Sequence, residues 1–537
     1  MNLKFITALF VLIYLSTEVK SQIIQRERPK AWNQLVHGGR FMDRFLPIST
    51  DENLRKDTWG AKAVIPRAIN NGIEDNQWSY WGGNARLYKD GKYHLFVCRW
   101  AEDAPKGHMS WHDSHVVHAI SESPSGPYKV IAEIGKGHNP EWYITNSGKI
   151  VIYVIDGYYV ADNINGPWKY SKFQFNTRDR RIIEGLSNLT FAKREDGSFI
   201  MVCRGGGVWI SKDGLSPWNQ ITDKRIYPAV DGHFEDPLIW KTENQYHLIV
   251  NDWYGRIAYY LRSKDGVKWT VDPGEAYEPG ICKHSNGVIE DWFKFERIKV
   301  LQDKYGRATQ AHFAVIDTLK HFDLPNDNHS SKQIIIPLRV GKRMKILNKH
   351  RISSSTKEIK VLVKSEAGFN PIKDLDINSL RFGASGKVNY GKGAKAKNII
   401  QKGNDAVVTF YGENNGLTSG NFMAKLLGKC KNGVPVFGYS RLPNVKYIAP
   451  ILSATKPKIE RDNVIVEISN FGQVSSSKAT IHLFQKDRLI AKGTISKLAP
   501  YTHQLVKMRL KKQVDLKEET TVVINKGKDD EVRFPSK

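Results

Sequence analysis

Several acidic and histidine side chains have the types and positions that acid–base chemistry requires. Each precedes a strand-like segment of a repeated β unit. Hydrolysis of a glycoside needs one protonated carboxyl group on the leaving oxygen and one ionised carboxylate that attacks or activates water. A group this rich in ionisable residues is more polar than a protein core needs, so it marks the candidate site. Its members are Glu184, Glu235, Asp236, Glu290, His138 and His233.

Two arginines could hold an anionic group of a substrate. Arg204 precedes three glycines, and Arg256 follows a Trp-Tyr-Gly segment. A guanidinium binds a carboxylate or a sulfate through paired hydrogen bonds. His138 and His233 could bind sugar hydroxyl groups, transfer protons or ligate a central ion. The predicted substrate-binding residues are Asn84, His138, Asn188, Arg204, His233, Glu235 and Arg256.

No metal-binding motif accompanies these residues. His112, His115 and His118 lack the ligand spacing of a zinc site, and the four cysteines include no Cys-x-x-Cys pair. We therefore predict no metal ligands and no cofactor. A central divalent cation has no motif in its favour.

An internal repeat predicts the elements that position the candidate site. Turns ending in an aromatic residue recur, and their aromatics are spaced by 40, 50 and 51 residues. Each turn follows a hairpin and a further strand-like segment, which is the strand order of a propeller blade. A fifth copy covers 295–316, so the sequence predicts a five-bladed β-propeller over 57–340. The innermost strands of a propeller converge, which would bring the starts of the repeats together. The aromatics are Tyr128, Trp168, Trp218 and Trp269.

With this layout the chain resembles the five-bladed propellers of glycoside hydrolase family 43 and its relatives in families 32, 62, 68 and 117. The similarity covers about 280 residues and rests on the blade layout and on short motifs. Glu184-Gly185 is similar to the general-acid motif of the family, and Gly232-His233 resembles its central histidine. The resemblance implies a glycosidase in which Glu184 donates the proton.

The chain departs from the family pattern at the general base. Asn84 and Asn139 stand where family 43 has the aspartates that act as base and as modulator of the acid. An amide cannot accept a proton, so another carboxylate must act as the base if the chemistry is the same. We predict that Asp236 is this base or nucleophile, with Asp75 and Asp113 as further candidates.

Most of the positive charge lies in the C-terminal third of the chain. Residues 341–537 contain 37 Lys and Arg against 16 Asp and Glu, whereas the first 340 residues contain 44 against 39. Such a surplus attracts polyanions, and for an exported protein an anionic polysaccharide is a more common partner than nucleic acid. The alternative is a solvated basic surface without a partner. We predict a β-rich accessory domain over 341–450 and an immunoglobulin-like β-sandwich over 451–537.

The N-terminus has the pattern of a secretory signal. Lys4 precedes the apolar run 5–15, and a small residue, Ser21, is placed for cleavage. We predict a signal peptide over 1–21, a lead segment over 22–56 and a periplasmic or secreted protein. The sequence after residue 21 contains no apolar run of about 18 residues, so no transmembrane segment is predicted.

The sequence therefore predicts an all-β protein, a five-bladed β-propeller followed by C-terminal β-sandwich modules. The predicted function is an exported, exo-acting glycoside hydrolase with Glu184 and Asp236 as the catalytic pair. Its expected substrate is an oligosaccharide from an anionic polysaccharide of algal type, carrying sulfate or uronic acid. Two alternatives stay open: a lyase or dehydratase that removes a proton from a uronate with His or Tyr, and a sugar-binding propeller without catalysis.

Overall fold

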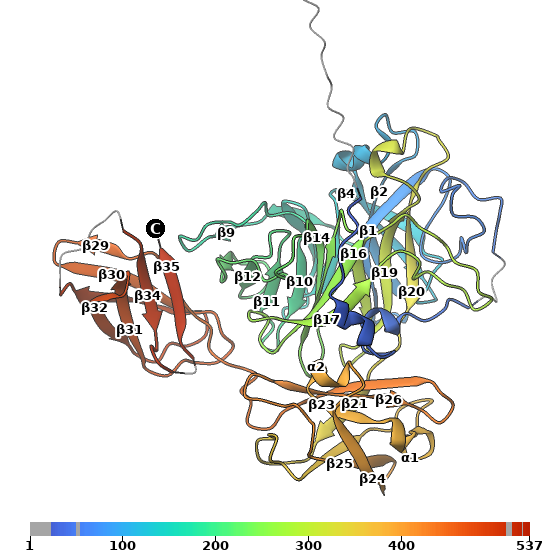
Figure 1. Ribbon diagram of the computed structural model, residues 1–537. Coiled ribbons are helices and arrows are strands. Elements are labelled where there is room, and N and C mark those ends of the chain that lie inside the picture. Colours follow the sequence, from blue (N-terminus) through green and yellow to red (C-terminus); the bar gives the residue numbers. More distant parts are fainter. Residues whose placement is uncertain (1–22, 50–53, 512–517, 529, 537) are drawn as a thin grey trace, which may run out of the picture.

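The computed structural model describes residues 23–49, 54–511, 518–528 and 530–536, and the predicted signal peptide lies outside them. The described chain is all-β, as predicted, and its helical segments are three to seven residues long. Three parts follow one another: five sheets built from β1–β20, a closed barrel built from β21–β27, and two sheets built from β28–β35 (Figure 1). No helix in the described part of the chain is long and apolar enough to cross a membrane.

The first five sheets are antiparallel and follow one another along the chain, apart from β9, which pairs parallel to β13. In each of the five sheets a hairpin turn joins the first two strands, and the repeat in the sequence predicts these hairpins. The sheets are, in order, β1 (Trp78–Leu87), β2 (Tyr93–Ala101), β3 (His115–Ser121) and β4 (Lys129–Lys136); β5 (Glu141–Ile144), β6 (Ile150–Val154), β7 (Gly157–Ala161) and β8 (Lys169–Lys172); β10 (Thr190–Lys193), β11 (Phe199–Val202), β12 (Val208–Ser211) and β13 (Trp218–Gln220), with β9 (Phe175–Asn176) beside β13; β14 (Phe234–Lys241), β15 (Tyr246–Asp252), β16 (Ile257–Ser263) and β17 (Thr270–Tyr277); and β18 (Lys294–Gln302), β19 (Ala308–Ile316) and β20 (Ser331–Pro337).

The middle strands are apolar on both faces because each sheet is packed between two others. All residues of β6 and β11 are buried, and both strands consist mainly of β-branched and aromatic residues. Hydrophobic clusters join neighbouring sheets. One cluster contains Tyr143 and Tyr153 of the second sheet together with Phe191 and Trp209 of the third. The sheets are therefore fixed to one another by shared cores.

The first strands of the five sheets form a closed ring. β1 contacts β5 and β18, and β14 contacts β10 and β18. The ring is completed between β5 and β10, where Glu141 accepts a hydrogen bond from the backbone N–H of Phe191. Glu141 also forms a buried ion pair with Lys299 of β18, whose ammonium donates to Thr190 of β10 at 3.3 Å. These buried contacts link β5, β10 and β18 within the ring.

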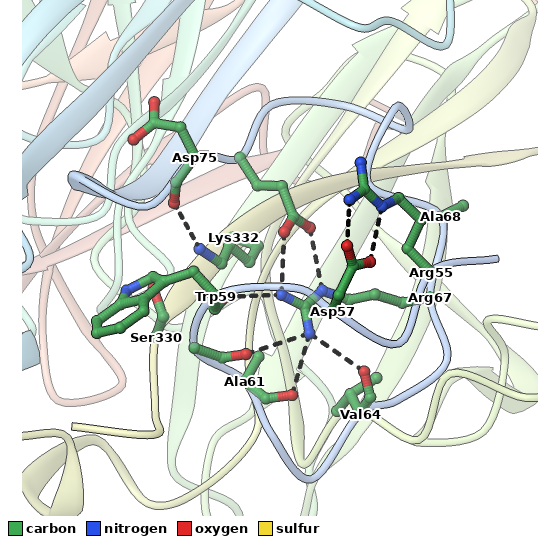
Figure 2. A network of polar contacts seen from close by, with 12 residues as sticks. Arg55, Asp57, Trp59, Ala61, Val64, Arg67, Ala68, Asp75, Ser330 and Lys332 are labelled. Atoms are coloured by element: carbon green, nitrogen blue, oxygen red, sulfur yellow. Dashed lines mark hydrogen bonds and ion pairs between the residues drawn. The ribbon is translucent and has the colours of Figure 1, made fainter. Parts of the chain in front are cut away.

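The segment before β1 is anchored by a buried arginine. The Arg67 side chain is 1% exposed and forms an ion pair with Glu74 at 2.9 Å. The same guanidinium donates to the carbonyl oxygens of Trp59, Ala61 and Val64 (Figure 2). Its five donors therefore fold 59–74 around one charge, and Ile73 then pairs with Gln333 of the fifth sheet.

The barrel and the two C-terminal sheets have separate hydrophobic cores. The barrel order is β21-β22-β25-β24-β23-β26-β27, closed by the parallel pair β21 and β27. In the last part, β28, β30, β29 and β33 form one sheet, and β32, β31, β34 and β35 form the other. The strands are β21 (Lys342–Ile346), β22 (Glu358–Val363), β23 (Arg381–Gly383), β24 (Ala394–Lys402), β25 (Asp405–Tyr411), β26 (Met423–Lys429), β27 (Pro435–Arg441), β28 (Leu452–Ala454), β29 (Lys458–Glu460), β30 (Asn463–Asn470), β31 (Ala479–Gln485), β32 (Arg488–Ile495), β33 (His503–Arg509), β34 (Thr520–Ile524) and β35 (Val532–Ser536).

Both C-terminal parts are docked on the five-sheet ring by arginines. Arg44 of the lead segment lies over the ring of Phe437 at 4.3 Å and donates to the Tyr439 hydroxyl, both on β27 of the barrel. Arg178, between the second and third sheets, forms an ion pair with Glu467 of β30 at 2.8 Å. The two parts therefore contact different sides of the ring (Figure 1).

Candidate active site

A cavity of about 330 Å³ opens where the first strands of the five sheets begin. Two short helical turns lie over it: η3 (Gly107–Asp113), which follows β2, and η4 (Lys320–Phe322), which follows β19. All five sheets or the loops that lead into them contribute side chains, so the cavity is the meeting point that the repeat predicts. Its lining includes Trp81, His108, Trp111, His138, Asn139, Asn188, Arg204, Glu235, Asp236, Trp253, Lys294, Glu296, Arg297, Lys320 and His321.

Three carboxylates meet in this cavity. Oxygen atoms of Glu235, Asp236 and Glu296 all lie within 4.8 Å of one another. Glu235 and Asp236 come from β14 and Glu296 comes from β18, so the group forms only when the fourth and fifth sheets are side by side. Like charges at this distance disfavour simultaneous ionisation unless cations compensate them.

A β-bulge in each of the two strands positions Glu235 and Glu296. The pairing of β14 shifts between Glu235 and Leu238, and the pairing of β18 shifts between Glu296 and Lys299. In each strand the residue after the glutamate has a left-handed backbone, with φ of 52° at Asp236 and 49° at Arg297. A bulge inserts a residue and redirects the neighbouring side chains. Glu235 and Glu296 are therefore equivalent positions of two adjacent sheets.

The carboxyl group of Glu235 stays partly protonated up to neutral pH. Burial raises the pKa of its carboxyl group to about 7, and the charges of Asp236 and Glu296 add to this rise. Lys320 and Arg204 oppose the shift. The Glu235 side chain is still 17% exposed, and Arg204 contacts it at 3.1 Å. It is a carboxylic acid that can reach the cavity and donate a proton.

Glu296 is kept ionised by two lysines. Burial alone would raise the pKa of its carboxyl group, but Lys320 and Lys294 outweigh burial and lower the pKa below its usual value. Lys320 forms a close ion pair with one oxygen, and Lys294 lies 3.5 Å from the other. Glu296 thus has one buried oxygen whose nearest cation is Lys294 and which accepts no hydrogen bond from the described residues.

Asp236 has a different environment from the two glutamates. Its side chain is 2% exposed, and one oxygen is bound by the Arg297 guanidinium at 3.1 Å. The other oxygen accepts the backbone N–H of Arg297 at 3.1 Å. Asp236 therefore has both oxygens occupied and connects the two bulges.

His138 lies in the wall of the cavity beside aromatic side chains. Its Nδ1 is 3.0 Å from the Ser114 hydroxyl, and Trp111 packs against its ring at 4.7 Å. Burial lowers the pKa of His138 well below its ordinary value, and Arg297 and Lys320 add to this effect. The ring is therefore neutral and can exchange hydrogen bonds with a sugar. Asn139 donates to Asn188 at 3.2 Å on the same side.

The other predicted residues lie outside the cavity lining. Glu184 is half-exposed and contacts Arg204 at 3.1 Å and Arg225 at 3.4 Å. Asn84 is buried and accepts the backbone N–H of Trp142, which ties the first sheet to the second. His233 is exposed and packs against Tyr254, and Arg256 donates to the carbonyl oxygen of Phe293. Asp75 binds the hydroxyl of Tyr80, and Asp113 is exposed beside Lys136.

The predicted cluster also included Glu290, which has a structural role. Its carboxylate accepts hydrogen bonds from the backbone of Ala68 and from the Trp292 indole, and it pairs with His284 at 2.9 Å. Glu290 lies just before the fifth copy of the repeat, whereas Glu296, inside its first strand, lines the cavity and was not predicted. The repeated Phe-Glu pair, Phe234-Glu235 and Phe295-Glu296, could have identified it. Lys294, Arg297 and Lys320 were also missed.

The three carboxylates have the composition of a cation site, but the surrounding charges do not fit one. Asp236 is bound by Arg297, and Glu296 is bound by Lys294 and Lys320. A divalent cation bound here would have to displace these contacts or face three neighbouring positive charges. The arrangement therefore favours acid–base chemistry by the protein's own side chains.

Comparisons with known proteins give only distant similarities. No family model and no curated protein matches the sequence. Similar solved structures include a family 117 glycoside hydrolase of the marine bacterium Zobellia galactanivorans, with 13% identity, 50% of this chain and 88% of that chain covered, and a TM-score of 0.34. They also include a putative exo-β-1,3-galactanase of Bifidobacterium bifidum, with 15% identity, coverage of 55% and 91%, and a TM-score of 0.32. A third is a family 43 arabinoxylan arabinofuranohydrolase of Bacillus subtilis, with 10% identity, coverage of 93% and 97%, and a TM-score of 0.34. These values assign no activity to this chain.

Proposed function

We propose that the protein is a glycoside hydrolase in which Glu235 is the proton donor and Glu296 is the nucleophile. The observation that carries the proposal is that these two carboxyl groups share one cavity while their surroundings shift their pKa values in opposite directions. Pairs of this kind divide the roles of acid and ionised carboxylate between two chemically similar groups.

The proposed reaction uses each group in the state in which the cavity holds it. Glu235 protonates the glycosidic oxygen while Glu296 attacks the anomeric carbon, which gives a glycosyl ester on Glu296 and a free alcohol. Glu235, now ionised, takes a proton from water, and the resulting attack releases the sugar and restores both groups. Carboxyl groups of retaining glycosidases are about 5–5.5 Å apart, and those of inverting enzymes about 6.5–9.5 Å. The oxygens of Glu235 and Glu296, within 4.8 Å, favour the retaining route.

Two residues predicted as catalytic receive supporting roles in this proposal. Asp236 raises the pKa of Glu235 through its charge, although burial of Glu235 has the larger effect. Glu184 contacts Arg204, which in turn contacts Glu235, so Glu184 positions that arginine. The predicted pair of Glu184 and Asp236 is less favourable, because both oxygens of Asp236 are bound by Arg297.

The architecture that we propose is the one predicted from the sequence. We interpret the five sheets as the blades of a propeller over 57–340, followed by an accessory barrel over 341–450 and an immunoglobulin-like sandwich over 451–537. The buried pair of Glu141 and Lys299 joins two strands that are not neighbours in the ring, which supports a blind pocket and exo-action on chain ends. Export through a signal peptide over 1–21 belongs to the same proposal.

An anionic sugar is the proposed substrate class. Four cations, Arg204, Lys294, Arg297 and Lys320, face three carboxylates in the cavity, and protonation of Glu235 increases the surplus. A surplus of positive charge favours a sulfate or carboxylate on the sugar. Of the four, Arg204 is the most exposed, with 40% of its side chain accessible.

A panel of neutral, sulfated and uronate oligosaccharides with mass readout tests the proposal. Hydrolysis adds one water for each bond cleaved, whereas elimination adds none and produces an unsaturated uronate that absorbs ultraviolet light. We expect hydrolysis, abolished in Glu235→Gln. An unsaturated product would assign the lyase alternative, and binding without cleavage of any panel member would assign the non-catalytic one.

A further inference from the structure

A second cavity, of about 780 Å³, lies at the junction between the fifth sheet and the barrel. Its volume is within the range of ligand pockets, roughly 300–1,000 Å³. One wall comes from the fifth sheet and the segment after it, 338–340, and the other from the start of β21 and the turns 366–374 and 430–435 of the barrel. No residue of this wall lines the candidate active site.

The charged residues of this cavity are unevenly paired. Asp303 and Glu366 both bind Arg307, at 2.8 Å and 2.7 Å. The carboxylate of Asp374 accepts the backbone N–H of Asn370. Four further cations line the cavity and have no carboxylate partner among the described residues: Arg339, Lys342, Lys373 and Lys431.

Two of these unpaired cations are partly withdrawn from water. Burial lowers the pKa of both Arg339 and Lys342. The ammonium of Lys342 lies over the ring of Phe369 at 4.2 Å, and the buried Nε of Arg339 has no hydrogen-bond partner among the described residues. Glu366 acts on Lys342 only from a distance, and neither cation forms an ion pair among the described residues, so binding of an anion between them is favourable.

We propose that this cavity, the junction site, binds an anionic oligosaccharide through sulfate or carboxylate groups, separately from the active site. Arg339 follows the fifth sheet, whereas Lys342 and Lys431 belong to the barrel, so one ligand can contact both parts of the protein. The junction site would hold a polyanionic chain while the active site processes its end. The saccharide nature of the ligand rests on the proposed function, whereas the preference for anions rests on the lining alone.

Calorimetric titration of the full chain carrying Glu296→Gln tests the junction site without turnover. The probes are tetragalacturonate for carboxylate, an ι-carrageenan tetrasaccharide for sulfate, and maltotetraose as the neutral control. We expect at least one anionic probe to bind, and its affinity to fall at high salt. Maltotetraose should show no salt-dependent binding. Adding Lys342→Gln and Lys431→Gln should raise the Kd about tenfold, which corresponds to about 1.4 kcal/mol.

A matched double variant controls for the loss of net charge. Lys345→Gln and Lys360→Gln remove two exposed barrel lysines that do not line the cavity, and this pair should leave the Kd unchanged. Equal weakening by both doubles, or absence of binding by both anionic probes, would overturn the junction site. Separate activity measurements keep its failure distinct from that of the proposed function: both doubles, made without Glu296→Gln, should retain wild-type kcat on a short substrate.

Discussion

A carboxylate oxygen of Glu235 lies within 4.8 Å of one of Glu296, although 60 residues separate the two in the sequence. Each glutamate occupies the same position of a bulged first strand, in two adjacent sheets. Their surroundings nevertheless differ: burial and Asp236 raise the pKa of Glu235, while Lys320 and Lys294 hold Glu296 ionised. The fold thus produces two chemical roles from one repeated structural position.

The pH dependence of activity should follow from these two groups. Glu235 must be protonated, so activity should fall as the pH rises through about 7. Glu296 must be ionised, and its lowered pKa places the acidic limb below about 4.5. Arg204→Gln removes a cation that lowers the pKa of Glu235, so the alkaline limb should move to higher pH. Arg225 contacts Glu184, so Arg225→Gln should leave the alkaline limb where it is. Equal shifts of this limb in both variants would contradict the assignment of Glu235 as the acid.

The stereochemistry of the product follows from the short separation between the carboxyl groups of Glu235 and Glu296. If Glu296 is the nucleophile, the sugar should be released with the anomeric configuration of the substrate. Proton NMR during the first minutes of reaction, before mutarotation, reports the configuration. Release of the opposite anomer would show that water attacks directly and that Glu296 is not the nucleophile.

The buried pair of Arg67 and Glu74 should be critical for stability. Glu74→Gln leaves a guanidinium that is 1% exposed without its counter-charge, and breaking a buried pair in this way costs about 3–5 kcal/mol. Asp57→Asn breaks the exposed pair with Arg55 in the same segment (Figure 2) and should have little effect on stability, because solvent screens exposed ion pairs. Urea unfolding of the two variants checks the difference. Similar losses in both would mean that Arg67 does not anchor the segment.

Buried histidines should make the fold sensitive to acid. His312 is buried, neither ring nitrogen has a hydrogen-bond partner among the described residues, and burial lowers its pKa to about 3. An unfolded histidine titrates near 6.5, so between these values the unfolded chain binds more protons and stability is lost as the pH falls. His312→Phe should therefore reduce the loss between pH 8 and pH 5 by about 2 kcal/mol. Urea unfolding at both pH values measures it; an unchanged loss would contradict the expectation.

The sequence predicts the strands and turns of the first five sheets well, because apolar segments and the turn residues between them are adjacent in the chain. The turn at 195–198, for example, separates two apolar segments of the third sheet. The closure of the barrel depends on pairing between β21 and β27, which are far apart in the chain, and no local pattern indicates it. Long-range pairing of this kind is decided by packing, so only a β-rich segment could be predicted.

The candidate site could be predicted only in part. Glu235 and Asp236 were identified because acidic residues precede a clear strand. Glu296 was missed because the register of β18 decides which glutamate faces the cavity, and register is fixed by the neighbouring sheets. Lys320 was missed because it lies in the loop after β19 and approaches Glu296 only through the fold.

The most direct test of the account compares an oligosaccharide with its dinitrophenyl glycoside, whose leaving group needs no protonation. Glu235→Gln should lower kcat on the oligosaccharide by roughly 10²–10⁴-fold and should be much less impaired on the dinitrophenyl glycoside. Glu296→Gln should be inactive on both, and Glu184→Gln should retain most of the activity on both. The account is contradicted if Glu235→Gln cleaves the oligosaccharide at the wild-type rate while Glu184→Gln shows the selective loss.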